Sequence, residues 1–136
     1  MIRPGSGRYS EPVESAAEWS VERHLAGKPE FVVDLYERFV KLIAACGPFT
    51  YRITKTAITF KGTHRGFAGA KPRKSSLDGF LDLQRALKDE RFLRASPYTK
   101  RLFVHQFRIT RIEQMDESFA SWVNEAYLVG GGAHRE

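Results

Sequence analysis

The stretch from Phe49 to Arg73 constrains the fold most strongly, because it is rich in β-branched and aromatic residues and contains no Asp or Glu. Apolar and polar residues alternate along it, so that Tyr51 and Ile53 point one way and their neighbours the other. This period of two is typical of a strand with one packed and one solvated face. The glycines of Gly62–Gly66 favour a turn after the strand that ends near Phe60. The stretch therefore predicts the central part of an antiparallel sheet.

Helical spacing appears on both sides of this stretch. Apolar residues recur every three or four positions from Val32 to Cys46, which predicts an amphipathic helix that Gly47 and Pro48 end. Ser20 is a good N-cap for a shorter preceding helix, and Asp116 is a good N-cap for the last one. We expect the second and last helices to pack on one face of the sheet. The side chains expected to be buried together are Leu35, Phe39, Phe60, Phe107, Phe119 and Trp122.

Further alternation predicts strands around Phe67–Ala70, Leu77–Leu83 and Arg101–Ile109. The segment Gln84–Lys100 is ambiguous, because the spacing of Leu87 and Leu93 fits either a short helix or an irregular connection, and we expect a loop with a helical turn. The predicted fold class is α+β, an antiparallel sheet of four to five strands with helices packed on one face. We expect a flexible lead-in over residues 1–18, a single domain over 19–128 and a disordered tail over 129–136.

Charge is distributed unevenly along the 136 residues, whose formal net charge is +6. No acidic residue lies between Glu37 and Asp78, so the predicted sheet carries mainly cations. Basic residues interleaved with aromatics favour binding to phosphates, with an aromatic ring available for stacking. The opposite interpretation is that the aromatics are core and the cations only a solvated face. The candidate polyanion-binding residues are Arg52, Lys55, Lys61, Arg65, Lys71, Arg73 and Lys74.

Other chemistry finds little support in the sequence. The four histidines lack the close spacing that metal ligation favours, and Cys46 has no cysteine partner. His105 shares a predicted strand face with Phe103 and Phe107, so we expect a hydrogen-bonded core histidine and not a catalyst. We therefore expect no catalytic residues, no metal and no cofactor. The lone cysteine, the absence of a signal-peptide core and the absence of a membrane-spanning run of about 20 residues predict a cytoplasmic protein that does not bind a membrane.

The order of several short motifs resembles a known bacterial family. These motifs are Ser20-Val-Glu-Arg-His-Leu-Ala-Gly-Lys-Pro29, Ile53-Thr-Lys-Thr56 before an Ile-x-Phe strand, Phe67-x-x-x-Lys-Pro72, and Trp122-Val-Asn-Glu-Ala-Tyr127. Together they cover Trp19 to Tyr127 and resemble the domain of unknown function 5655. The resemblance implies a small α+β domain, often fused to other modules, with no established activity, cofactor or catalytic set.

The sequence thus indicates a non-catalytic binding module with a basic sheet surface for nucleic acid or another polyanion. One alternative is a protein–protein docking module that binds an acidic partner. A third hypothesis is an enzyme that uses His105 in a pocket lined by the sheet. The sequence does not indicate the oligomeric state.

Overall fold

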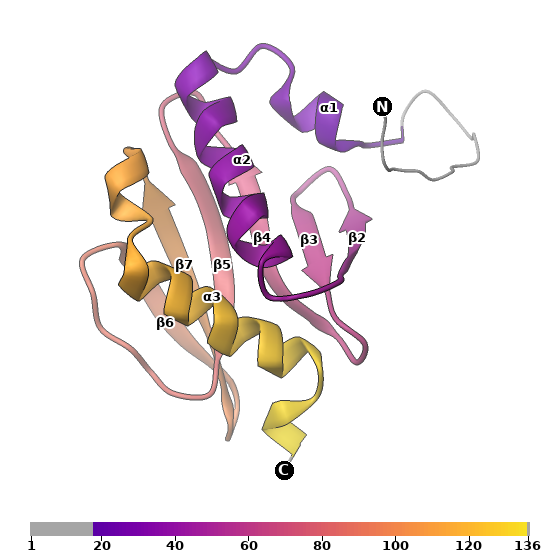
Figure 1. Cartoon of the computed structure of the whole chain (residues 1–136), viewed down its shortest axis with the longest axis vertical. Coiled ribbons are helices and arrows are strands. Elements are labelled where there is room, and N and C mark those ends of the chain that lie inside the picture. Colours follow the sequence, from indigo (N-terminus) through magenta and orange to yellow (C-terminus); the bar gives the residue numbers. More distant parts are fainter. Residues whose placement is uncertain (1–17, 136) are drawn as a thin grey trace.

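One sheet of six antiparallel strands organises the part of the chain, residues 18–135, that the computed structural model describes (Figure 1). Its strand order is β2-β3-β4-β5-β7-β6, so that β5 and β7 lie side by side and β6 forms an edge. The strands are β2 (Thr50–Ile53), β3 (Ile58–Lys61), β4 (Gly66–Pro72), β5 (Leu77–Leu83), β6 (Phe92–Thr99) and β7 (Leu102–Ile109). The predicted α+β class and antiparallel sheet are confirmed, but the predicted number of four to five strands is wrong.

The additional strand is β6, which lies in the segment expected to be a loop with a helical turn. It pairs with β7 alone, and register shifts occur between Phe92 and Arg94 and between Pro97 and Thr99. These irregularities interrupt the alternation that marks a regular strand. Pro97 has no N–H to donate, which an edge strand tolerates. The segment therefore lacks the periodic apolar signal by which the other strands were predicted.

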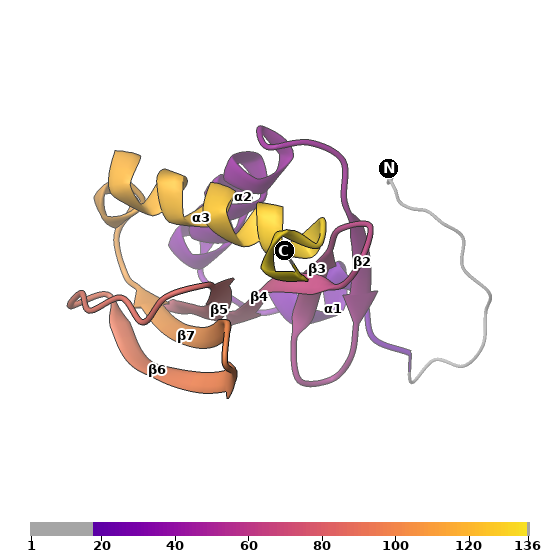
Figure 2. The same cartoon turned by 90° about the horizontal axis from the view of Figure 1, so that it is seen from below.

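Two helices, α2 (Glu30–Ala44) and α3 (Glu117–Gly130), cover one face of the sheet (Figure 2). Both follow from local sequence, since α2 presents an apolar stripe and Asp116 caps α3 by accepting a hydrogen bond from the backbone of Phe119. A short helix α1 (Val21–Leu25) is capped by the Ser20 side chain, as predicted. The remaining helical turns are η1 (Ile112–Gln114) and η2 (Ala133–Arg135).

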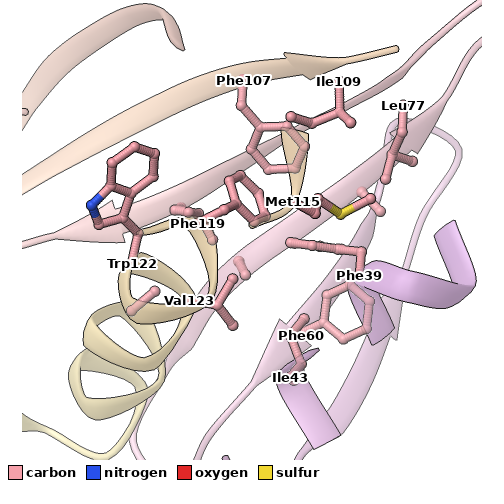
Figure 3. Close-up of a cluster of buried hydrophobic side chains, with 14 of the residues drawn as sticks. Phe39, Ile43, Phe60, Leu77, Phe107, Ile109, Met115, Phe119, Trp122 and Val123 are labelled. Carbon is pink, nitrogen blue, oxygen red and sulfur yellow. The ribbon is translucent and has the colours of Figure 1, made fainter. Parts of the chain in front are cut away.

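The core lies between the sheet and these two helices (Figure 3). Phe39 of α2 is fully buried, and its ring contacts those of Phe60, Phe107 and Phe119 at centroid distances of 5.6, 5.3 and 6.2 Å. One side chain thus joins both helices to strands β3 and β7. All six residues expected to be buried together belong to this cluster.

Helix α3 ends against the turn between β3 and β4. Its last residue is Gly130. The carbonyl of Gly130 accepts hydrogen bonds from the backbone N–H groups of His64 and Arg65, at 2.8 and 3.3 Å. This contact places the β3–β4 turn beside the C-terminal end of α3.

Candidate functional site

The face of the sheet opposite α2 and α3 carries three of the seven predicted site residues. Ile58 and Phe60 of β3 are buried on the helix side, so Thr59 and Lys61 project from the other side. Residues paired across strands share a face, which extends this second surface to every strand. We call it the open face; its strand residues are Thr50, Arg52, Thr59, Lys61, Gly66, Gly69, Lys71, Asp78, Phe80, Asp82, Leu102, Val104, Gln106, Arg108, Arg94, Ser96 and Thr99.

Of the seven predicted residues, Arg52, Lys61 and Lys71 lie on the open face, on three neighbouring strands. Arg52 is exposed, whereas Lys61 and Lys71 are half-buried. Lys55 is exposed in the turn between β2 and β3. These three strand residues thus project from the same side of the sheet, and their role in binding a polyanion stays a prediction.

Arg65 has a different role, because it forms an ion pair with a buried carboxylate. Its Nη2 lies 2.9 Å from Oδ2 of Asp82, and its guanidinium carbon lies 5.3 Å from the centre of the Tyr98 ring. The side chain of Asp82 is 4% exposed and that of Arg65 is 27% exposed. Removing Arg65 would leave a buried carboxylate without its cation, which is strongly destabilising. Arg65 thus connects the β3–β4 turn to β5 and β6.

Asp82 is the most perturbed acid among the described residues with a resolved shift. Its second oxygen, Oδ1, is buried and has no hydrogen-bond partner within residues 18–135. Burial raises the pKa of Asp82 to about 6, although the charge and hydrogen bond of Arg65 act in the opposite direction. The carboxyl group is therefore half protonated near pH 6.

Arg73 and Lys74 lie in the β4–β5 turn, next to the end of β7. They line a concavity of about 440 Å³, which we call the β4–β5 pocket, together with Ser75, Ser76, Arg108 and Thr110. Asp78 lies under this group and accepts two hydrogen bonds from Arg108, at 3.0 and 2.9 Å. Burial alone would raise the pKa of Asp78, but the hydrogen bonds from Arg108 and Ser76 outweigh it and lower that pKa. Asp78 is consequently ionised at neutral pH.

Several residues of the open face were not predicted from the sequence. Arg108 of β7 and Arg94 of β6 lie outside the acid-free stretch, and the side chain of Arg94 is within 3.4 Å of Gln106. The alternation of β7 could have identified Arg108, since Phe107 and Ile109 are its apolar neighbours. No periodic signal marks Arg94, because of the register shift in β6.

The aromatic residues that interleave with the cations in the acid-free stretch do not lie on the open face. Phe60 and Phe67 are fully buried, and Tyr51 lies on the helix side of β2, against Phe49 and Phe60. Phe80 of β5 lies on the open face and is half-buried. Its ring covers Gly69 on the neighbouring strand, where a side chain would collide with it. A ring placed over a strand glycine compensates for the missing side chain.

His105 is a structural residue. It is fully buried, its Nε2 accepts a hydrogen bond of 2.9 Å from the backbone N–H of Leu87, and its Nδ1 lies 3.0 Å from the carbonyl oxygen of Phe103. These contacts assign the proton to Nδ1, and burial lowers the pKa of the ring. The β4–β5 pocket does not include His105. The hypothesis of an enzyme that uses His105 in a sheet-lined pocket is therefore not supported by this geometry.

Other reactive groups are not assembled into a site. Within residues 18–135, no three His, Cys, Asp or Glu side chains gather in a way that would hold a metal ion. Cys46 is half-buried at the end of α2, where its thiol is 3.4 Å from the carbonyl of Leu42 and burial raises its pKa. A raised pKa disfavours the thiolate form that acts as a nucleophile.

Comparison with known families identifies the domain. The sequence profile of the family described as "Domain of unknown function (DUF5655)" matches residues 21–130, from the start of α1 to the end of α3. The chain belongs to the DUF5655 family. No significant match was found among curated proteins or solved structures. The match spans every strand and both covering helices of the DUF5655 fold, so it confirms the resemblance noted in the sequence.

Proposed function

We propose that this DUF5655 domain is a non-catalytic binding module whose open face binds nucleic acid or another polyanion. The observation that carries the proposal is the distribution of cations on that face. Arg52, Lys61, Lys71, Arg108 and Arg94 come from β2, β3, β4, β7 and β6, which leaves β5 as the one strand without a cation there. The two carboxylates of β5, Asp78 and Asp82, are already bound to arginines.

The dimensions of the face fit a polymer. Strands lie 4.7–4.9 Å apart, so the distance from β2 to β6 across five spacings is about 24 Å. Cations spread over this distance can contact several successive phosphates of one strand. Phe80 lies in the same cross-strand row as Arg52 and Arg94 and offers a partly exposed ring to a base. Base–aromatic stacking of this kind tolerates any sequence.

The expected binding is weak and independent of base sequence. The two covering helices, α2 and α3, lie on the other side of the sheet (Figure 2), so neither can enter a groove from the open face and contacts to phosphates would dominate. Such contacts give dissociation constants of about 1–100 µM at physiological salt. The logarithm of the affinity should fall linearly with the logarithm of the salt concentration, with a slope of about −0.7 to −0.9 per phosphate contacted.

The test compares two double variants that remove the same charge. Arg52→Ala with Lys71→Ala removes two cations of the open face, and Lys41→Ala with Lys88→Ala removes two exposed cations elsewhere. Binding to a labelled single-stranded oligonucleotide is measured by fluorescence anisotropy between about 20 and 200 mM salt. We expect the first variant to reduce the slope by about 1.4–1.8 and the second to leave it nearly unchanged. Equal effects of both variants would refute the open face as the binding surface.

Arg65 is not varied, because its removal would leave the buried carboxylate of Asp82 without its cation and destabilise the domain. A loss of binding could then result from unfolding instead of from a lost contact with the ligand. Thermal unfolding of both double variants provides the control for folding. Absence of binding by the wild-type domain even at about 20 mM salt would contradict the proposal. The acidic-protein docking hypothesis would then take its place, since the same cations would face carboxylates instead of phosphates.

The expected cytoplasmic location and the absence of membrane contact stay predictions. Among residues 18–135, no helix is long and apolar enough to cross a membrane.

A further inference from the structure

The β4–β5 pocket differs from the rest of the open face in the chemistry of its walls. All six residues that line its volume of about 440 Å³ are polar, and three of them, Arg73, Lys74 and Arg108, are cations. Sites for small organic ligands are mostly apolar with a few polar groups. The side-chain stems of the three cations and the methyl group of Thr110 add apolar surface, but every lining side chain carries a polar or charged group. Charge and hydrogen bonds therefore give this pocket its selectivity for a ligand.

Buried contacts hold the base of the pocket in place. Asp78 accepts a hydrogen bond of 2.8 Å from the hydroxyl of Ser76 as well as the two from Arg108, and Nε of Arg73 lies 3.8 Å from its Oδ2. Arg108 uses Nε and Nη2 for Asp78, which leaves its Nη1 group to donate elsewhere. Three cations face one carboxylate, so the pocket keeps an excess of positive charge.

The turn supplies groups that are free to bind a ligand. The backbone N–H of Arg73 donates to the carbonyl of Ser76 at 2.9 Å, which closes the turn around Lys74 and Ser75. Both side chains are exposed, and within residues 18–135 neither the Lys74 ammonium nor the Ser75 hydroxyl has a hydrogen-bond or ion-pair partner. The pocket thus combines a fixed arginine with an adaptable lysine and hydroxyl.

We propose that the β4–β5 pocket binds the terminal phosphate of a nucleic acid strand that lies on the open face. A terminal phosphate monoester carries a charge of about −1.5 to −2 at pH 7, whereas each internal phosphodiester carries a single charge. A cluster of three cations therefore favours the strand end over the interior. Lys71, Asp78 and Arg108 form one continuous row of the sheet, which joins the pocket to the open face. This inference rests on the proposed function, and it adds recognition of the strand end.

The lining also indicates that the pocket does not recognise the terminal base. No aromatic side chain borders it, so the terminal base is not stacked there and its identity has no effect. The distinguishing feature of the ligand is the phosphate itself.

The experiment uses three single-stranded oligonucleotides of about ten nucleotides with one sequence, carrying a 5′-phosphate, a 3′-phosphate or neither. Binding to the wild-type domain is measured at about 50 mM salt. We expect one of the phosphorylated forms to bind about 5- to 20-fold more tightly than the form without a terminal phosphate, the range for two or three favourable exposed charge pairs. Backbone amide resonances of Lys74, Ser75 and Thr110 should shift on addition of that form alone.

A double variant, Arg73→Ala with Lys74→Ala, tests the location. Both side chains are exposed, so the domain should fold normally. We expect this variant to lose the preference for the phosphorylated end. The Arg52→Ala, Lys71→Ala variant should instead weaken all three oligonucleotides and keep the preference.

Each outcome separates the two proposals. Equal affinity of the wild-type domain for all three oligonucleotides overturns end recognition and leaves binding by the open face intact. Binding of a phosphorylated form alone supports the pocket and overturns the extended contact. Failure of all three to bind overturns both proposals. Arg108 is not varied, because its loss would leave Asp78 buried without its main partner.

Discussion

At the scale of single residues, close backbone contacts and buried charges set the geometry around the open face. Gly62, at the end of β3, lies against the backbone of Gly130 at the end of α3: a Cβ at position 62 would be 2.6 Å from the carbonyl carbon and oxygen of Gly130. The same two segments are joined by the hydrogen bonds from His64 and Arg65 to Gly130. Glycine is therefore required at position 62 by the close contact with α3, and not by the conformation of the β3–β4 turn itself.

We predict that Gly62→Ala destabilises the domain by about 2–4 kcal/mol, because the contact is with backbone that cannot move aside without breaking those hydrogen bonds. The matched control is Gly131→Ala, where the new Cβ would be 3.5 Å from the carbonyl oxygen of Leu128. Urea unfolding should show a loss for the first variant and a change within about 0.5 kcal/mol for the second. Equal stability of the two variants would show that the turn can separate from α3.

Asp82 gives a second prediction, on pH. Its pKa is about 6 in the folded state and about 3.9 in an unfolded chain, so the folded state binds the proton more tightly. The contribution of this group to stability is present below about pH 4 and is lost as the pH rises through 6. Between pH 4.5 and 7.5 the wild-type domain should lose about 2 kcal/mol relative to Asp82→Asn, as calculated from these two pKa values.

Urea unfolding of both proteins at several pH values measures this difference. Other titrating groups, including His105, are common to the two proteins and cancel in the comparison. A difference in stability that stays constant with pH would show that the folded-state pKa of Asp82 is not raised.

At the scale of elements, the sequence predicted those parts whose local pattern and final environment agree. Helix α2 and strands β3, β5 and β7 each present one apolar face, and that face is buried. Strand β6 was missed because its eight residues are mostly exposed and its register shifts twice. The ion pairs of Arg65 with Asp82 and of Arg108 with Asp78 join residues 17 and 30 positions apart. Such pairs depend on strand order, which no local pattern reveals.

The connection between β5 and β6 is held by a histidine, which allows a third prediction. His105→Leu removes the acceptor for the Leu87 N–H and leaves that donor without its partner, which costs about 1–3 kcal/mol. Amide hydrogen exchange at Leu87 should become faster than the loss of global stability alone would make it. Strand β4 serves as a control, because exchange there should change only through the loss of global stability.

The pH dependence of the free energy of unfolding tests whether the His105 ring is responsible for this difference in stability. Because burial lowers the pKa of His105 in the folded state, wild-type stability falls as the pH drops below the unfolded value of about 6.5. His105→Leu should lack this component. If the variant and the wild type lose the same stability between pH 7.5 and 5.5, then the folded-state pKa of His105 is not lowered.

At the scale of the whole molecule, the fold divides into two surfaces of opposite character. The helix side of the sheet forms one continuous core with α2 and α3, and the open face carries cations, two bound carboxylates and Phe80. This division explains why the sequence predicted the fold class better than the site. Alternation assigns residues to a face, and the apolar face must be buried. It does not reveal which cations on the other face are already bound to acids, as Arg65 and Arg108 are.

The layered core depends most on Phe39, which gives the last prediction. Its ring contacts aromatic rings from β3, β7 and α3, and the side chain is fully buried. Phe39→Ala should cost about 3–5 kcal/mol, the usual range for truncating a buried phenylalanine. Since domains of this size are stable by about 5–15 kcal/mol, the variant would lose a large part of the total. Phe31→Ala makes the same change about two turns earlier in α2, where the side chain is 44% exposed, and should cost much less. Urea unfolding measures the stability of the two variants, which should differ sharply. Binding of the oligonucleotide is measured under conditions where both variants are folded. The two affinities should be equal, because neither side chain lies on the open face. A loss of affinity in folded Phe39→Ala would show that the arrangement of the cations depends on the packing of α2.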